Sequence, residues 1–170
     1  MARQLWLLRH AEAEPHGSRE DSERRLTDRG EEDARLAGLA LARMGVEFDA
    51  ILFSPKVRAR RTAEIAAEAL SDEQRALLRV HMPLAGGFGA REALDAMGEA
   101  VGTGRLLLVG HEPDLSLIAG ELTGGRIEIK KGGLVVLRLN GAHLPTGAEL
   151  AILLRPREIA LLAGVPVGRY

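Results

Sequence analysis

Two short apolar runs, each followed closely by a histidine, constrain the fold of this chain more than any other feature. Residues 5–8 (LWLL) lead to Arg9 and His10, and residues 106–109 (LLLV) lead through one glycine to His111. Consecutive apolar side chains of this kind are typical of strands covered on both faces, as in a parallel sheet. Because ligands bind at the carboxyl ends of parallel strands, we expect both imidazoles to face one pocket.

The rest of the chain alternates between strand and helix patterns. Further strands are expected over residues 49–54, 133–139 and 149–154, and helices over 28–44, 56–70, 91–101, 113–122 and 156–162. A less regular stretch contains the short piece 80–82, and the polar turns Asn140-Gly141 and Pro145-Thr146-Gly147 separate the last two strands. These elements predict a single domain over residues 1–170, folded as a three-layer α/β/α sandwich with a mostly parallel central sheet and an antiparallel margin.

The stretch after the first histidine is polar and lacks an apolar period. We therefore expect residues 11–25 to form a loop, a mobile rim over the end of the first strand. Thr27 and Asp28 are favoured N-cap residues, and Asp28 with Glu31 has capping-box spacing, so a helix should begin there. Gly45 is placed to end that helix.

Composition excludes several classes of protein. Hydrophobic residues make up 46% of the chain and charged residues 28%, which indicates a packed globular protein rather than a disordered one. The 23 basic and 24 acidic side chains nearly cancel, so no overall field favours nucleic acid or a membrane surface. The chain has no cysteine, and no apolar stretch reaches the ~20 residues of a membrane span. We therefore expect a cytoplasmic protein.

Four residues at strand ends and at a helix start form a candidate site for a phosphoryl group: Arg9, His10, Arg58 and His111. A histidine that attacks phosphorus must be neutral and must lie near cations that neutralise the non-bridging oxygens. His10 is the candidate nucleophile, and the planar forks of Arg9 and Arg58 suit bidentate phosphate binding. Each residue alone could equally satisfy a carbonyl or form a surface ion pair, but the four together favour a site.

The segments LWLLRHAEAE, LTDRGEEDA, FSPKVRARRTAEI and LLLVGHEP resemble the histidine phosphatase superfamily, in its short SixA-type phosphohistidine phosphatase branch. The resemblance covers most of the chain and implies a phosphoglycerate mutase-like fold. It matches the family's RH element to Arg9 and His10, its second arginine to Arg58 and its second histidine to His111. It implies a covalent phosphohistidine at His10 that water then hydrolyses, with no cofactor. Ala11 stands where the wider superfamily usually has glycine, a departure that concerns loop shape more than chemistry.

The proton donor has a weaker sequence signature. Phosphomutase-like relatives carry a dedicated acidic residue in an insertion before the last histidine, and this chain is short there. Glu12 is the candidate, with Glu14 behind it, and Glu92 is the one carboxylate close in sequence to the missing insertion. Glu12 and Glu14 could instead be solvated loop charges. Because imidazole, with a pKa of ~6.5, leaves far more easily than an alkoxide, a site without a strong acid fits cleavage of a phosphorus–nitrogen bond.

Other polar residues fit surface roles. Lys130 and Lys131 could meet a phosphoprotein but fit a solvated turn better. Three histidines lack the spacing of metal ligands and are predicted to lie on the surface or in loops: His16, His81 and His143. A hypothetical set of metal ligands can be combined from Glu12, His16, His111 and Asp114. The two arginines that would then face the cation argue against it.

The sequence thus predicts a metal-independent phosphatase that acts on a phosphohistidine-bearing protein or on a small phosphorylated substrate. The alternatives are a broad phosphomonoesterase of small molecules, a non-catalytic phosphate-binding module and a metal-dependent hydrolase. An intact set of Arg9, His10, Arg58 and His111 favours catalysis, because a binding module has no need of a neutral nucleophile. The oligomeric state is not set by the sequence.

Overall fold

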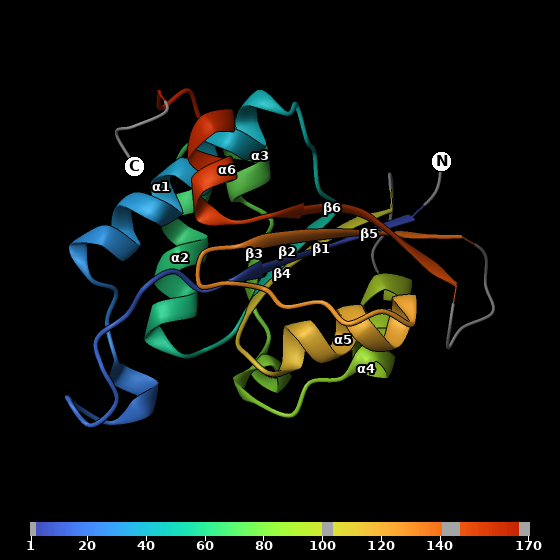
Figure 1. Ribbon diagram of the computed structural model, residues 1–170, viewed down its shortest axis with the longest axis horizontal. Coiled ribbons are helices and arrows are strands. Elements are labelled where there is room, and N and C mark those ends of the chain that lie inside the picture. Colours follow the sequence, from blue (N-terminus) through green and yellow to red (C-terminus); the bar gives the residue numbers. More distant parts are fainter. Residues whose placement is uncertain (1–2, 100–103, 141–146, 167–170) are drawn as a thin grey trace.

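The computed structural model describes residues 3–99, 104–140 and 147–166, and its centre is a six-stranded sheet. In spatial order the strands are β3 (Leu78–Val80), β2 (Ala50–Phe53), β4 (Arg105–Gly110), β1 (Arg3–Arg9), β5 (Leu134–Leu139) and β6 (Ala148–Leu154). β3, β2, β4 and β1 are mutually parallel, whereas β5 and β6 are antiparallel to their neighbours. The predicted mostly parallel sheet with an antiparallel margin is therefore confirmed (Figure 1).

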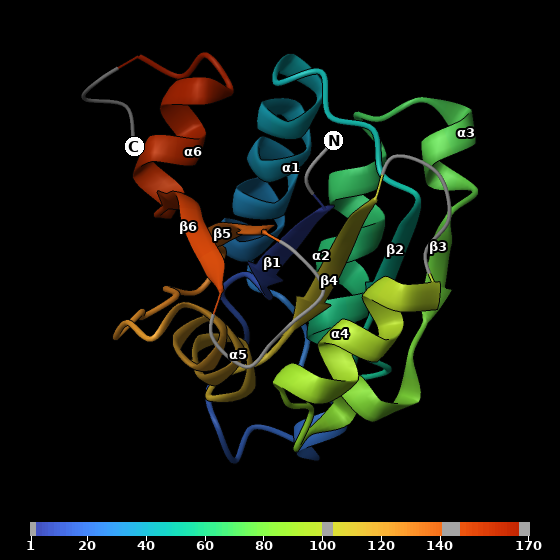
Figure 2. The ribbon, with the colours of Figure 1, turned by 90° about the vertical axis from the view of Figure 1, so that its right-hand side faces the viewer.

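Helices cover both faces of the sheet, which confirms the three-layer architecture. One face carries α1 (Asp28–Arg43), α2 (Val57–Ala67) and α6 (Pro156–Leu162), and the other carries α4 (Ala90–Glu99) and α5 (Asp114–Thr123) (Figures 1 and 2). The short helix α3 (Asp72–Arg75) leads into β3. In the described part of the chain, no helix has the length and apolar content needed to cross a membrane.

The central strands are apolar on both sides because each side belongs to a different core. Leu5 and Leu7 of β1 pack with α4 and α5, and Trp6 and Leu8 pack with α1, α2 and α6. All four side chains are at most 3% exposed. Full burial of such side chains stabilises the fold by about 1.5–3 kcal/mol each. The end of β1, and with it the candidate site, is thus held between two packed layers.

Two glycines of α1 allow close approaches that position the site. A Cβ at Gly38 would lie 2.1 Å from the carbonyl oxygen of Ala66, so α1 and α2 cross with backbone against backbone. A Cβ at Gly30 would lie 2.0 Å from the carbonyl oxygen of Glu12, so the loop after His10 rests on the first turn of α1. Any side chain at either position would separate these segments.

The start of α1 differs in one detail from the sequence prediction. Thr27 is the N-cap, and its side chain accepts a hydrogen bond of 3.1 Å from the backbone nitrogen of Gly30. Asp28 is the first residue of the helix, so the predicted capping box of Asp28 with Glu31 was wrong. The cap needs a residue in extended conformation, and the chain takes that conformation at Thr27, where it also bonds to the loop before it.

Several predicted boundaries shift, mainly where elements are short. α2 ends at Ala67 rather than at residue 70, and the short α3 and the 3₁₀ turn η2 (Met82–Ala85) were not predicted. The expected loop over residues 11–25 contains a second 3₁₀ turn, η1 (Asp21–Glu23). Elements of three or four residues are too short to show a period in sequence. The predicted end of the helix at residue 101 and most of the turn at 140–147 lie outside the described residues.

Candidate active site

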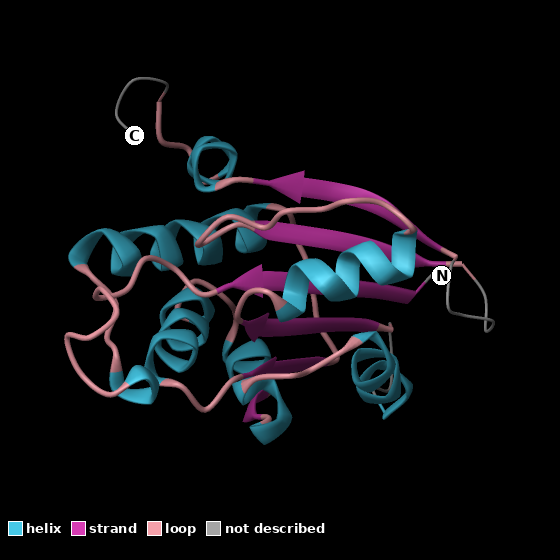
Figure 3. Ribbon diagram, turned by 60° about the horizontal axis from the view of Figure 1, so that its bottom comes forward, coloured by secondary structure: helices cyan, strands magenta, loops and turns pink. Residues whose placement is uncertain are grey.

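The two histidines lie at the same edge of the sheet. β1 and β4 are adjacent and parallel, with Arg9 opposite Gly110, so the residues that follow each strand emerge side by side. The ring centroids of His10 and His111 are 5.1 Å apart, with an angle of 54° between the planes. Each histidine is only 6% exposed. Figures 1 and 3 show the loop with η1 beyond the carboxyl ends of these strands.

His10 is neutral, and the lone pair of its ring lies on Nε2. Its Nδ1 lies 2.8 Å from the carbonyl oxygen of Ala11, and because a carbonyl only accepts, Nδ1 carries the proton. Nε2 accepts a hydrogen bond of 3.3 Å from Nε of Arg58. Burial lowers the pKa of His10 to about 3, and the nearby positive charges of Arg58 and Arg9 also lower it, against the bond to Ala11. At neutral pH the ring is therefore uncharged, as a nucleophile must be.

Arg58 lies in the first turn of α2 and is held from two sides. Besides its bond to His10, Nη1 donates to the backbone oxygen of Asp21 at 2.6 Å, and Nη2 donates to Oδ2 of Asp21 at 3.3 Å. Lys56, the N-cap of α2, donates to the same Oδ2 at 2.9 Å. The hydrogen bond from Lys56, with the charge of Arg58, holds the pKa of the Asp21 carboxyl far below its usual range.

Three buried polar atoms of the site lack a partner. Among the described residues, the buried side-chain nitrogens and oxygens without a hydrogen bond are Nε of Arg9, Nδ1 of His111 and Oε1 of Glu112. Such an atom costs about 1–3 kcal/mol when it is left unsatisfied, so native proteins keep few of them. Their concentration at one sheet edge marks a place where a polar ligand or water belongs. Arg9 itself is anchored through Nη1 to the carbonyl oxygen of Ile129 at 2.8 Å.

His111 is neutral and is oriented by a buried serine. Its Nε2 lies 2.7 Å from Oγ of Ser54, which is fully buried at the end of β2. Burial lowers the pKa of His111 to about 3, and the positive charges of Arg58 and Lys56 act in the same direction. Because Nε2 is engaged by the serine, Nδ1 is the ring nitrogen available to a ligand.

Thr62 fixes the loop after His10 against α2. Its Oγ1 accepts a hydrogen bond of 3.1 Å from the backbone nitrogen of Ala11 and donates one of 2.7 Å to the carbonyl oxygen of Arg58. Ala11 and Thr62 are both fully buried. A single hydroxyl therefore fixes the distance between the candidate nucleophile and the arginine beside it.

The sequence reasoning did not assign roles to five residues that shape this site: Asp21, Ser54, Lys56, Thr62 and Glu112. Two of them left a usable signal. Ser54 follows the end of β2, so the strand-end rule that found His10 also applies to it. Ser54 and Thr62 are also the first and last residues of the segment with the pattern S-x-x-x-R-A-x-x-T that carries part of the family resemblance. Asp21 left none, because its contacts depend on how a loop and a helix pack.

The three candidate proton donors have other partners in the structure. The Glu12 carboxylate accepts a hydrogen bond of 2.8 Å from the Thr27 hydroxyl, and Glu92 accepts one of 3.1 Å from the backbone nitrogen of Gly89. Glu14 pairs with Arg19 on the loop, at 2.7 Å. A proton-donor role for Glu12 therefore stays a prediction that rests on its place two residues after His10.

The remaining histidines and lysines lie apart from this cluster or at its edge. His16 is exposed, with Nδ1 3.8 Å from Asp21, and His81 packs edge-on against Phe88. Lys130 pairs with Glu128 on the surface, and Lys131 is exposed. His143 lies outside the described residues.

The hypothetical metal site of Glu12, His16, His111 and Asp114 is not formed in the structure. The carboxylates of Glu12 and Asp114 bond to Thr27 and to the backbone nitrogen of Phe88, respectively. Over residues 3–99, 104–140 and 147–166, no group of three or more histidine, aspartate or glutamate side chains is arranged to hold a metal ion.

Comparison with known proteins places this geometry in a family. Residues 5–80, which include Arg9, His10 and Arg58, match the model of the histidine phosphatase superfamily (branch 1). An uncharacterized protein of Picosynechococcus sp. is 36% identical over 161 residues, which are 91% of this chain and 97% of that protein. The chain belongs to the histidine phosphatase superfamily. It is therefore a phosphatase, a hydrolase that acts on a phosphorylated substrate.

Solved structures agree on the fold and on the short SixA-type branch. The chain superposes on the protein histidine phosphatase SixA in complex with tungstate with a TM-score of 0.78 and 23% identity, covering 92% of this chain and 99% of that one. A protein of Nakamurella multipartitia described as a putative phosphohistidine phosphatase SixA gives a TM-score of 0.76 and 26% identity, with 92% of this chain and 97% of that one covered. Mitochondrial serine/threonine-protein phosphatase PGAM5 of Mus musculus is 38% identical over 85 residues, which are 48% of this chain and only 29% of that protein.

Proposed function

We propose that this chain is a phosphohistidine phosphatase, which removes the phosphoryl group from a histidine of a signalling protein through a covalent phosphohistidine at His10. The observation that carries the proposal is the state of His10: a buried, neutral ring whose Nδ1 is tied to Ala11 and whose Nε2 lone pair lies beside Arg58. The SixA proteins, which share the fold and the chain length, support the substrate class. The chain has no cysteine, which suits a reducing cytoplasm.

In the first step, the hydrogen bond from Nε of Arg58 to Nε2 of His10 opens, and the freed lone pair of Nε2 attacks the phosphorus atom while the bond from phosphorus to the substrate imidazole breaks. The departing imidazole nitrogen takes a proton, for which Glu12 is the proposed donor. The charge on the non-bridging oxygens is stabilised by three groups, and the atoms offered are Nε of Arg9, Nδ1 of His111 and the guanidinium of Arg58. These donors are held in place before the substrate arrives, so little reorganisation is needed.

In the second step, water attacks the phosphohistidine at His10. The bond between phosphorus and Nε2 breaks, its electron pair returns to the ring, and inorganic phosphate leaves. The proton of the water passes to the carboxylate that acted as the acid in the first step, which restores the enzyme. The fixed charges of Arg9 and Arg58 neutralise the phosphoryl oxygens throughout, and on this the proposal of metal independence rests.

The leaving group favours phosphohistidine over an alkyl ester. An alkoxide is strongly basic and needs a well-positioned acid, whereas imidazole, with a pKa of ~6.5, leaves readily. In this site the candidate acid Glu12 already accepts a hydrogen bond from Thr27. The site is therefore suited to phosphohistidine, whose leaving group depends least on protonation.

The deciding experiment is phosphate release from a phosphohistidine-bearing signalling domain, with a chelator present and with His10→Ala as the comparison. We expect chelator-resistant release that is lost in His10→Ala. Release by the wild type only from small phosphoesters would replace the proposal with a phosphomonoesterase of the same superfamily. No release from either class of substrate would leave a phosphate-binding module, and release abolished by the chelator would indicate a metal-dependent hydrolase.

A further inference from the structure

Asp21 is the acidic residue on which the cations around the site converge. It begins the 3₁₀ turn η1, in the loop that follows His10, and all three of its oxygens accept hydrogen bonds. Oδ1 accepts from Nε of Arg24 at 3.1 Å, and Oδ2 accepts from Lys56 at 2.9 Å and from Arg58 at 3.3 Å. The backbone oxygen accepts from Nη1 of Arg58 at 2.6 Å.

These contacts occupy one edge of the Arg58 guanidinium. Both terminal nitrogens face Asp21, one at the backbone oxygen and one at the carboxylate, so the planar group cannot turn about its own axis. The remaining nitrogen, Nε, is thereby directed at Nε2 of His10. Arg58 is only 4% exposed, so water would not easily replace Asp21 as its hydrogen-bond partner.

The carboxylate also permits the three cations to lie close together. Arg24 and Arg58 are buried, and the ammonium of Lys56 approaches the same oxygen as Arg58. Without a negative charge between them, Lys56 and Arg58 would repel each other, and the flexible lysine and the arginine would separate. The loop residue Asp21 thus sets the orientation of a helix residue 37 positions away.

We propose that Asp21 is a positioning residue, which holds Arg58 with its Nε edge toward His10 so that the arginine is ready for phosphoryl transfer. The proposal rests on the proposed function in assigning His10 and Arg58 to that reaction. It differs from a purely structural role, in which Asp21 would only pin the loop onto α2. A structural role predicts loss of stability, whereas positioning predicts loss of turnover that depends on Arg58.

The first test compares Asp21→Ala with Glu23→Ala, an exposed acid of the same 3₁₀ turn. With a phosphohistidine-bearing domain as substrate, Asp21→Ala should lower kcat ten- to hundred-fold relative to this control, with a smaller change in KM. Asp21→Asn retains one accepting oxygen and should recover part of the rate. Equal rates for wild type and Asp21→Ala would overturn the proposal.

The second test asks whether Asp21 acts through Arg58. In an Arg58→Lys background the fork is absent, so Asp21→Ala should change kcat by less than two-fold there. If the substitution cost the same factor in both backgrounds, Asp21 would act independently of Arg58, and the positioning role would be refuted.

A spectroscopic readout separates this proposal from the proposed function. The Nε–H of Arg58 is buried against His10, so it should give a slowly exchanging resonance in a ¹⁵N–¹H spectrum, identified by its loss in Arg58→Lys. We expect Asp21→Ala to broaden or shift this resonance and Glu23→Ala to leave it unchanged. A wild type that is inactive on every substrate would reject the proposed function. An unaltered Arg58 resonance in Asp21→Ala would reject the positioning role of Asp21, whatever the activity of the wild type.

Discussion

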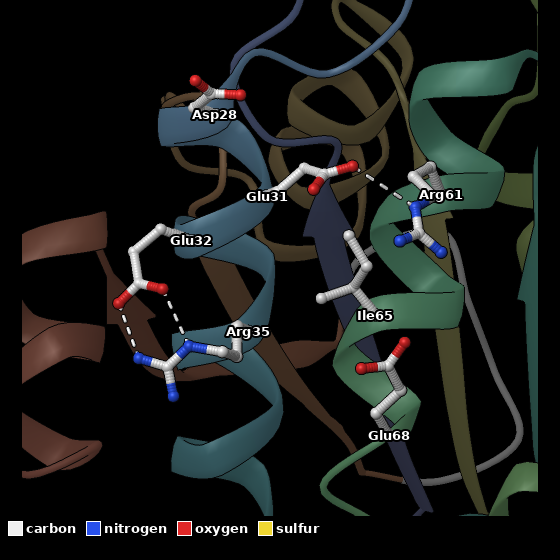
Figure 4. Close-up of a pocket in the computed structure, with 7 residues that line it drawn as sticks. All are labelled: Asp28, Glu31, Glu32, Arg35, Arg61, Ile65 and Glu68. Carbon is white, nitrogen blue, oxygen red and sulfur yellow. Dashed lines mark hydrogen bonds and ion pairs between the residues drawn. The ribbon is translucent and has the colours of Figure 1, made fainter.

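Two regions of this molecule gather charged side chains, the candidate active site and a hollow between α1 and α2, and they differ in how those charges are satisfied. At the end of β1, the site residues His10, Arg58 and His111 are at most 6% exposed. Between α1 and α2 lies a hollow of about 320 Å³, lined by Asp28, Glu31, Glu32, Arg35, Arg61, Ile65 and Glu68 (Figure 4). There the charged groups pair with one another in solvent, Glu31 with Arg61 at 3.4 Å and Glu32 with Arg35 at 2.6 Å.

The two regions differ in how their charged groups affect the free energy of folding. Exposed ion pairs contribute about 0–1 kcal/mol and need no further partner, so the hollow between α1 and α2 is complete as it stands. The site buries Nε of Arg9, Nδ1 of His111 and Oε1 of Glu112 without partners, which destabilises the fold. A cluster of charged side chains becomes a candidate site when its polar atoms are buried, held in place and still without a hydrogen-bond partner.

The largest predicted effect is a difference in activity between variants of the two regions. His10→Ala should lower phosphatase turnover at least ~10³-fold, because it removes the nucleophile. Arg61→Ala, which removes an ion pair of the hollow between α1 and α2, should leave kcat/KM within about two-fold. Initial rates of phosphate release measure both. A comparable loss of activity in the two variants would mean that burial does not distinguish the two regions.

Arg58→Lys should lower turnover by about 10²-fold, because lysine keeps the charge but cannot direct one nitrogen at His10 while two others bond to Asp21. The matched change in the hollow between α1 and α2 is Arg35→Lys, for which we expect no change in rate. Steady-state kinetics with thermal melting distinguish lost catalysis from lost stability. An Arg58→Lys variant with wild-type turnover would show that charge alone suffices.

Glu12→Gln should slow alkyl phosphate esters about ten-fold or more beyond its effect on phosphohistidine, since only the ester needs a strong acid to leave. Parallel kcat/KM measurements on a phosphohistidine-bearing domain and on an alkyl phosphate give the ratio. Glu14→Gln, in which the lost carboxylate pairs with Arg19, serves as the control. Equal losses on both substrates would remove Glu12 from the role of acid.

Stability should fall in acid because both site histidines are buried neutral. Their pKa values are about 3 in the folded protein, against ~6.5 in an unfolded chain, so the unfolded chain binds more protons between these values. The free energy of unfolding should therefore decrease as pH falls from ~6.5 toward ~3, by at most about 1.4 kcal/mol per pH unit for each histidine. Urea unfolding at a series of pH values measures this dependence. The unfolding free energy of His111→Asn should fall less steeply with decreasing pH than that of the wild type, whereas exposed His16→Asn should behave like the wild type.

The smallest effect is expected in the hollow between α1 and α2. Glu32→Gln breaks the exposed i,i+3 pair with Arg35 and should cost less than about 0.5 kcal/mol of unfolding free energy. Urea unfolding at low and high salt measures it, and the difference should shrink at high salt. A cost above 1 kcal/mol would show that this hollow too depends on a specific charge arrangement.

The parts of the site that follow from strand ends could be predicted, and the parts that follow from packing could not. The runs at 5–8 and 106–109 placed His10 and His111 at one sheet edge because parallel strands order their carboxyl ends in space. The sheet and its two helical layers followed from the same periodicity. Residue assignments by role remain predictions until the variants above are measured.

Contacts between segments far apart in sequence explain what was missed. The bond from Arg58 to Asp21 spans 37 positions and that from Ala11 to Thr62 spans 51, and each depends on how the loop and α2 dock. No local pattern encodes such a distance. The 3₁₀ turn that carries Asp21 has three residues, too few for a period, and so its carboxylate looked like one more solvated charge in a polar loop.

The hydrogen bond from Nδ1 of His10 to the Ala11 carbonyl makes the tautomer of the nucleophile robust to mutation. Every amino acid that could replace Ala11 carries the same carbonyl group, so no side-chain substitution at that position removes the acceptor. Only a change in backbone path could do so, and that path is pinned by Thr62 and by the close approach to Gly30. The main chain therefore determines which ring nitrogen of His10 reacts. Mutations would change that nitrogen only by altering the path of the backbone around it.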